Sequence, residues 1–149
     1  MVIDWNDLEL TFEYVSSGPV GAHEAVLCRK TGKFLWHSEL FDDEDDWPED
    51  ADDEKKYLPI PHKNELDLGK PLVFEFARQF LPDEYDEVRS IFSRRGAYGQ
   101  FKVLLQRKRA LDRWHEFENR ATEKALRAWC DANGLTIGER QAGAGPTRI

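Results

Sequence analysis

The sequence predicts an α+β fold with a short N-terminal helix, an antiparallel β-hairpin and a C-terminal bundle of about four helices. Two observations predict this. Two short apolar runs flank a glycine-containing turn in the first third of the chain, and from about residue 68 onward the apolar residues recur at helical spacing. The length of 149 residues fits one domain, which we place at residues 1–135, with an acidic loop at 39–56. The glycine-rich tail, residues 136–149, is expected to be mobile.

The N-terminal helix is predicted from apolar residues three and four positions apart. These are Trp5, Leu8, Phe12 and Val15. Asp4 stands where an N-cap is needed, and the turn-forming residues 16–19 end the element.

The hairpin is predicted at residues 23–29 and 34–38, which are rich in apolar and aromatic side chains. Gly32 lies between them, where a turn needs a positive φ. Residues 57–61 contain two prolines, each of which disfavours helix in the residue before it. This segment is therefore expected to be extended, and it can dock along the hairpin as an edge strand.

The C-terminal half is predicted to be helical throughout. Its helices are marked by the apolar sets Leu72, Phe76 and Phe80; Tyr85, Val88 and Phe92; Tyr98, Phe101, Leu104 and Leu105; and a long run from Leu111 to Trp129. Pro82 with acids in the following turn opens the second helix, and Asn133-Gly134 ends the last.

Charge is divided unevenly along the chain. The net charge is −8, but residues 1–60 carry −11 and residues 61–149 carry +3. Eleven carboxylates and no lysine or arginine lie between Glu39 and Glu54. We expect this stretch to be a solvated loop, and the asymmetry suggests an interaction segment.

Composition favours a cytoplasmic protein. There is no apolar run near the length of a membrane span, and the N-terminus lacks a secretory leader. The cysteines, Cys28 and Cys130, lie far apart without a CxxC pair, and both are expected to be small buried hydrophobes.

The sequence contains none of the familiar catalytic, nucleotide-binding or metal-binding motifs. His37 and His62 flank the acidic loop, but the calcium-hand pattern fails at Trp47, where it requires glycine. The clustered acids of residues 83–87 are explained by the first turn of a helix. We therefore assign no catalytic, cofactor or metal residue.

A basic junction follows the second C-terminal helix. The candidate residues for binding an anion or a partner are Arg94, Arg95, Tyr98, Lys102, Arg107, Lys108, Arg109 and Arg113. Three interpretations stay open. Arg94 and Arg95 can end a helix whose C-cap is Gly96, the basic stripe Arg94–Arg113 can receive the acidic loop of the same or another chain, or the stripe can bind an external anion.

Several short motifs together resemble a known family. They are Ala25-Val26-Leu27, Thr31-Gly32, Trp36-x-Ser38, residues 57–61, Arg95-Gly96-Ala97-Tyr98-x-x-Phe101-Lys102, Trp114-x-x-Phe117, Ala125-Leu126-Arg127-x-Trp129-Cys130 and Asn133-Gly134. The chain is similar over about residues 5–135 to a bacterial group known as uncharacterised protein family number one hundred and fifty-eight. The resemblance implies a bacterial source and one domain, and no activity or cofactor.

We expect a non-enzymatic interaction or regulatory protein that binds another macromolecule, most simply another protein or a second copy of itself. The alternative is a protein that binds nucleic acid or phosphate through the basic stripe. The net charge of −8 weighs against nucleic acid. A small hydrolase-type enzyme is a third, weaker option.

Overall fold

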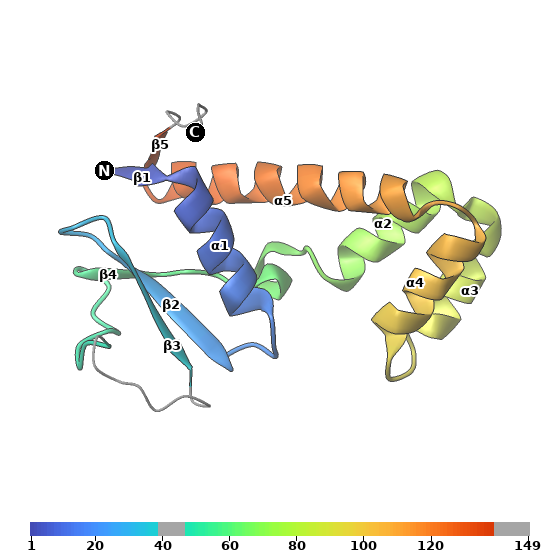
Figure 1. The fold of residues 1–149 in the computed structure, drawn as a ribbon, viewed down its shortest axis with the longest axis horizontal. Helices are drawn as coiled ribbons and strands as arrows, with labels where there is room; N and C mark the ends of the chain where they lie inside the picture. The colour runs from blue at the N-terminus through green and yellow to red at the C-terminus, as the bar shows by residue number, and fades with distance from the viewer. Residues whose placement is uncertain (39–46, 139–149) are drawn as a thin grey trace. The chain divides into compact units, whose positions relative to one another are not determined.

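The computed structural model describes residues 1–38 and 47–138, and the chain divides into two units (Figure 1). The first unit is Met1–Lys63 with Arg127–Ile149, and the second is Asn64–Leu126. The predicted α+β fold is confirmed: an N-terminal strand and helix and a three-stranded antiparallel sheet come first, and four helices follow.

The sheet of the first unit has the order β3-β2-β4. The predicted hairpin is formed by β2 (His23–Cys28) and β3 (Phe34–Ser38), and Gly32 has the positive φ, +77°, that its turn requires. The third strand, β4 (Tyr57–Pro59), pairs antiparallel with the other edge of β2, with Cys28 opposite Tyr57. The expected edge segment is thus confirmed. Its proline stands on an edge strand, where a missing N–H is tolerated.

Helix α1 (Trp5–Ser16) packs against the sheet. Its predicted cap is confirmed, since the Asp4 carboxylate accepts a hydrogen bond from the Asp7 backbone N–H at 3.0 Å. The buried Thr11 hydroxyl accepts a hydrogen bond at 2.9 Å from the indole N–H of Trp36 on β3. Trp36 lies opposite Ala25 in the ladder, so the Ala25 face of β2 looks toward α1 and the Val26 face looks away from it.

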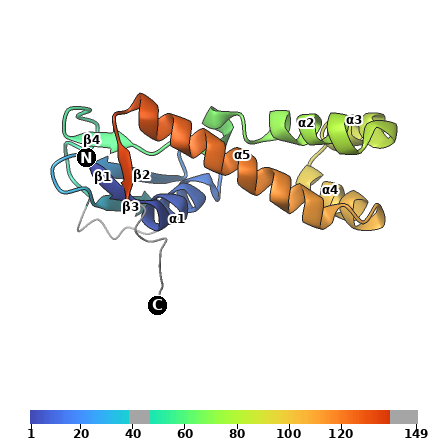
Figure 2. The ribbon, with the colours of Figure 1, turned by 90° about the horizontal axis from the view of Figure 1, so that it is seen from above.

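A second, two-stranded sheet was not anticipated from the sequence. Strand β1 (Val2–Asp4) pairs in parallel with β5 (Thr136–Gly138). In Figure 2, β5 is the red strand that lies near the N-terminus. The pairing draws residues 136–138, which we assigned to a mobile tail, into regular structure. Three-residue strands carry no readable period, and this contact joins residues more than 130 positions apart, so local sequence holds no signal for it. The rest of the predicted tail, residues 139–149, lies outside the described residues.

The second unit contains α2 (Lys70–Phe80), α3 (Tyr85–Ile91), α4 (Ala97–Arg107) and the first part of α5 (Leu111–Ala132), whose last turns belong to the first unit. A short 3₁₀ turn, Pro82–Glu84, precedes α3, which packs against α4 (Figure 1). Aromatic rings fill the core: Trp114 contacts Phe76 and Phe101 edge-on, with ring centroids 5.2 and 5.3 Å apart. Trp114 is therefore a core residue rather than an exposed stacking platform.

The helix ends follow the expected chemistry, with one exception. At the end of α5, Gly134 has φ +71°, and the backbone N–H of Leu135 bonds to the Cys130 carbonyl at 2.9 Å, as predicted for a left-handed stop. Gly96 also has a positive φ, +70°, but it is not the C-cap of α3. That helix ends at Ile91, and Gly96 is the residue before α4, because tight turns carry the chain from Phe92 to Arg94 first.

Candidate functional site

The described part of the acidic segment, residues 47–56, forms consecutive turns beside the sheet. The backbone N–H of Asp53 bonds to the Asp50 carbonyl at 2.9 Å, and that of Lys56 bonds to the Asp53 carbonyl at 3.0 Å. The Arg29 N–H then donates to the Lys56 carbonyl at 2.9 Å, which joins the segment to the end of β2. Residues 47–56 thus form a loop, as expected from the sequence, and this loop is made of turns and is hydrogen-bonded to the sheet. Residues 39–46 lie outside the described part of the chain.

An aromatic contact fixes the start of this segment to the sheet. The Trp47 indole stacks on the His37 ring of β3, with centroids 4.9 Å apart and planes inclined by 20°. His37 is the ladder partner of Glu24, so both side chains lie on the face of the sheet that looks away from α1. The indole therefore supplies the apolar surface that a run of carboxylates lacks.

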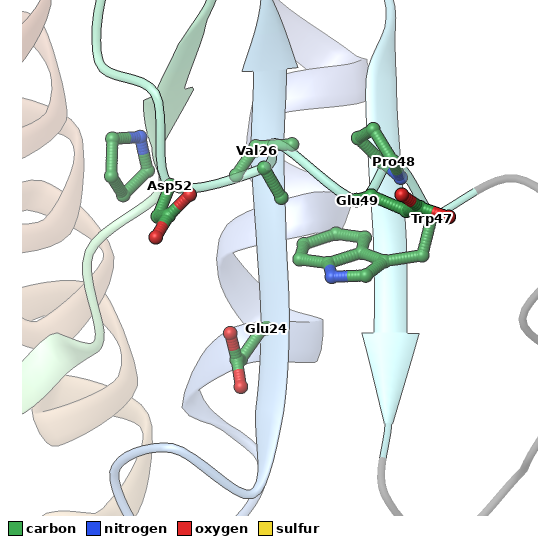
Figure 3. A pocket seen from close by; sticks show the side chains of 8 residues that line it. Glu24, Val26, Trp47, Pro48, Glu49 and Asp52 are labelled. Carbon is green, nitrogen blue, oxygen red and sulfur yellow. The ribbon is translucent and has the colours of Figure 1, made fainter.

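A pocket of about 490 Å³ lies between this segment and that face of the sheet. Its walls combine the carboxylates of Glu24, Glu49 and Asp52 with the Trp47 indole and the apolar side chains of Val26 and Pro59. Figure 3 shows Glu24 and Val26 rising from the same strand, with Trp47, Pro48 and Glu49 on the segment beside it. Among the described residues, none that lines this pocket is basic.

One carboxylate of the segment is neutralised locally. Asp50 forms an ion pair of 2.7 Å with Lys56. The hydrogen bond from the Lys56 ammonium lowers the pKa of Asp50, and the same bond raises the pKa of Lys56. Asp50 does not line the pocket, so this pairing leaves the negative charge of Glu24, Glu49 and Asp52 in place. These three side chains are exposed, and the pocket wall is therefore strongly acidic.

Several residues of the predicted basic stripe contact neighbours within the second unit. Arg107 donates two hydrogen bonds to the carboxylate of Glu87, at 2.9 and 3.0 Å, and Lys108 pairs with Glu84 at 3.1 Å. The guanidinium of Arg113 lies 5.2 Å from the ring centroid of Phe80. Three of the predicted residues thus have partners within the second unit, and the helix-start acids Glu84 and Glu87 provide two of those partners.

The remaining stripe residues have separate environments. Arg94, Arg95 and Lys102 are exposed, and within the described part of the chain they form no ion pair. Arg109 has φ +57° at the left-handed position that ends α4, where glycine is preferred. That the stripe binds an anion stays a prediction.

Tyr98, also a predicted contact residue, is partly occupied by its neighbours. Its ring lies edge-on to Phe92 with centroids 5.0 Å apart, although 47% of the residue remains exposed. Burial of its hydroxyl, with Glu118 nearby, raises the pKa of Tyr98. It is a half-buried packing residue more than an open stacking platform.

The two histidines that flank the acidic segment are not brought together as metal ligands. His37 stacks on Trp47, while the buried His62 donates a hydrogen bond from Nε2 to the Gly18 carbonyl at 2.7 Å. Within residues 1–38 and 47–138, no group of three or more His, Cys, Asp or Glu side chains is placed to hold a metal ion. The same residues contain no helix with the length and apolarity to cross a membrane.

Sequence reasoning missed the acidic pocket, although one signal for it was present. Trp47 is a large apolar side chain inside a run of carboxylates, which indicates that it packs against another part of the chain. What the sequence did not reveal is that this indole meets His37 and that Glu24 and Val26 share its side of the sheet.

No family model matches the chain, and no curated protein or solved structure matches it. The resemblance to the uncharacterised family therefore stays a prediction.

Proposed function

We propose that this protein is a non-enzymatic interaction protein whose acidic pocket (Glu24, Val26, Trp47, Glu49, Asp52 and Pro59) binds a positively charged segment of another protein. The supporting observation is the composition of the pocket wall. Three carboxylates and an indole converge on one cavity, and no described residue of that wall is basic.

The carboxylates supply attraction and orientation more than tight binding. All three are exposed, and an exposed ion pair contributes only about 0.2–1 kcal/mol. A cluster of one sign nevertheless raises the local concentration of a partner of the other sign and speeds encounter. Binding is thus expected to be fast, modest in affinity and weakened by salt.

The indole and the apolar wall favour arginine over lysine in the bound segment. A guanidinium stacks on aromatic rings and forms two parallel hydrogen bonds with a carboxylate, which an ammonium does not do. Val26 and Pro59 can cover the aliphatic stem of the same side chain. The partner is therefore a protein with an exposed, arginine-bearing segment.

The test uses fluorescein-labelled pentapeptides of alternating glycine and arginine, glycine and lysine, or glycine and glutamate. We expect saturable anisotropy changes for arginine, weaker ones for lysine and none for glutamate. The triple variant Glu24→Gln/Glu49→Gln/Asp52→Asn should lower the arginine peptide's affinity about tenfold, since each lost pair costs up to about 1 kcal/mol.

The matched control is Glu13→Gln/Asp83→Asn/Asp131→Asn, which removes the same charge from exposed positions outside the pocket. Equal weakening in both triple variants would mean that net charge alone attracts the peptide, and the proposal would fail. Sedimentation of the unlabelled chain then shows whether the partner is a second copy. Dimerisation that the pocket variant abolishes and the control retains would identify the arginine-bearing segment as this chain's own.

A further inference from the structure

A second cavity lies at the opposite end of the same strands and has the opposite charge. It measures about 520 Å³ and is lined by Cys28, Arg29, Lys30, Lys55, Lys56 and Tyr57. The pairing of β2 with β4 creates it, because Cys28 lies opposite Tyr57 and the basic residues that follow one strand meet those that precede the other. The volume is in the range that small-molecule sites occupy.

The charges of this basic cavity are only partly balanced. Lys56 pairs with Asp50 at 2.7 Å. Arg29, Lys30 and Lys55 form no ion pair with any residue that the structure describes, although the chain has 29 acidic side chains for 21 basic ones. Among the described residues, no carboxylate lines the cavity. A surplus of positive charge is therefore concentrated at one hollow of an acidic protein.

One of these cations is held in position. The Nε–H of Arg29 donates to the Glu54 backbone carbonyl at 2.9 Å. This bond orients the guanidinium of Arg29, a half-buried residue, and leaves its two terminal NH₂ groups available to donate hydrogen bonds to an anion. Lys30 and Lys55 are exposed and adaptable, which suits them to neutralise further charge on a ligand.

The thiol in the wall responds to the same surroundings. The hydrogen bond with the Thr31 hydroxyl lowers the pKa of Cys28, and the Lys30 charge acts in the same direction. The half-buried Tyr57 ring adds an apolar surface beside these charges.

From this arrangement we propose that the basic cavity is a binding site for a small phosphate-bearing molecule, held by Arg29, Lys30 and Lys55 with its organic part against Tyr57. A phosphate monoester carries close to two negative charges at neutral pH and accepts two hydrogen bonds from a guanidinium, so it matches this wall better than a single carboxylate. The site is separate from the acidic pocket, and its test does not depend on the arginine-peptide experiment.

Cys28 provides the measurement. The probe is phenyl phosphate, and the signal is the rate at which iodoacetamide, an uncharged reagent, alkylates Cys28 at constant ionic strength. Phenyl phosphate should slow the reaction saturably, by at least fivefold at the plateau, whereas phenol should not. Cys130 is fully buried and serves as the internal unreactive thiol.

The main variant is Lys30→Gln/Lys55→Gln. Both side chains are exposed and form no ion pair with any residue that the structure describes, so we expect these substitutions to leave the fold intact. Arg29→Lys is the second variant, and it keeps the charge while removing the planar fork. For each variant, the alkylation rate is expressed relative to the rate of the same variant without phenyl phosphate. The concentration of phenyl phosphate that gives half of the maximal protection should then be about tenfold higher than for the unmodified chain. The control Lys70→Gln/Lys124→Gln removes the same charge from exposed helical positions and should behave like the unmodified chain.

Three results would overturn the proposal. They are an alkylation rate that phenyl phosphate does not change, equal protection in the lysine variant and the unmodified chain, and protection only by an oligonucleotide of ten thymidines with a steep salt dependence. The last result would indicate a surface for nucleic acid in place of a small-molecule site.

Discussion

The two cysteines illustrate how strongly a single side chain depends on its neighbours. Both were expected to be buried, which is right for Cys130 and wrong for Cys28, which is only half-buried. Burial, with Asp131 nearby, raises the pKa of the Cys130 thiol from 9.0 to about 11, against the opposing charge of Arg127. At Cys28, the hydrogen bond with the Thr31 hydroxyl and the charge of Lys30 instead lower the pKa of the thiol. Each cysteine follows an apolar residue, Leu27 or Trp129, so the local sequence did not distinguish the two environments.

The raised pKa of Cys130 predicts a loss of stability in alkali. Between pH 9 and 11 the unfolded chain releases this proton and the folded chain keeps it, so the free energy of unfolding falls as the pH rises through that window. The loss amounts to about 2–3 kcal/mol by pH 11. Below pH 9 this thiol does not make the free energy of unfolding depend on pH.

Urea unfolding at several pH values checks this against the Cys130→Ala variant. The variant is expected to be less stable at neutral pH because it leaves a small cavity, but to lose less stability on going to pH 11. Both chains share the other groups that titrate in alkali, so the difference between their two pH profiles isolates the contribution of Cys130. Identical pH profiles would show that the buried thiol is not the cause.

Among the helices, two ends share one backbone geometry, but the sequence predicted only one of them. Helices α4 and α5 end in the same way, with a backbone N–H two residues beyond the cap that donates to a carbonyl of the last turn. In α4 the Ala110 N–H donates to the Leu105 carbonyl at 2.8 Å, and in α5 the Leu135 N–H donates to the Cys130 carbonyl at 2.9 Å. Gly134 has the left-handed conformation that this requires, and Arg109 adopts it without being glycine. The sequence predicted the helix stop at Gly134, whereas no feature of the sequence predicted a left-handed conformation at Arg109.

Gly96 and Gly99 form a matched pair for testing the start of α4. Neither would meet a neighbouring atom if a Cβ were added, so backbone conformation alone separates them. Gly96→Ala should destabilise the chain by about 1–2 kcal/mol, because φ is +70° there. Gly99→Ala, inside the helix, should stabilise it by about 0.5–1 kcal/mol.

Thermal or urea unfolding of the two variants measures this directly. The opposite signs are the decisive feature, since an effect of added volume would act in the same direction at both positions. If Gly96→Ala were neutral, the left-handed turn before α4 would not be needed for the folded state.

Elements with a strong local signal were predicted well, and those built by distant pairing were not. The spacing of Trp5, Leu8, Phe12 and Val15 predicted α1, and Gly32 between two apolar runs predicted the hairpin. The pairing of β1 with β5 was missed because each strand is three residues long. The end of α3 was placed too late because Arg94, Arg95 and Gly96 resemble a helix terminus, although the chain has already left the helix at Ile91.

Across the whole chain, the division of charge was visible in the sequence, but its consequences were not. Bases of the second unit are partly satisfied by acids of the same unit, as in the pair of Arg107 with Glu87. In the first unit, acidic and basic side chains gather instead at two separate cavities, one lined in part by Asp52 and the other in part by Lys55 and Lys56. Whether a given charge faces a partner or a cavity depends on strand register, which composition does not encode.

The candidate site shows the same limit. The acidic stretch predicted an interaction segment, yet the pocket needs Glu24 and Val26 from a strand more than 20 residues earlier, and the Trp47–His37 contact that fixes the segment beside that strand. The residue types alone suggested an interaction segment, and the proposal of a positively charged partner rests on the pocket that the three-dimensional structure forms.

The most direct test of the proposed binding surface is a titration of the ¹⁵N-labelled chain with the glycine–arginine pentapeptide, followed by backbone and indole N–H chemical shifts. The proposal predicts saturable shifts at the Trp47 indole and at the backbone of Glu24, Val26, Glu49 and Asp52, with none at the basic residues 94–113. These shifts should shrink together as salt is raised. Shifts spread evenly over exposed acids, or absent from Trp47 and Glu24, would contradict it.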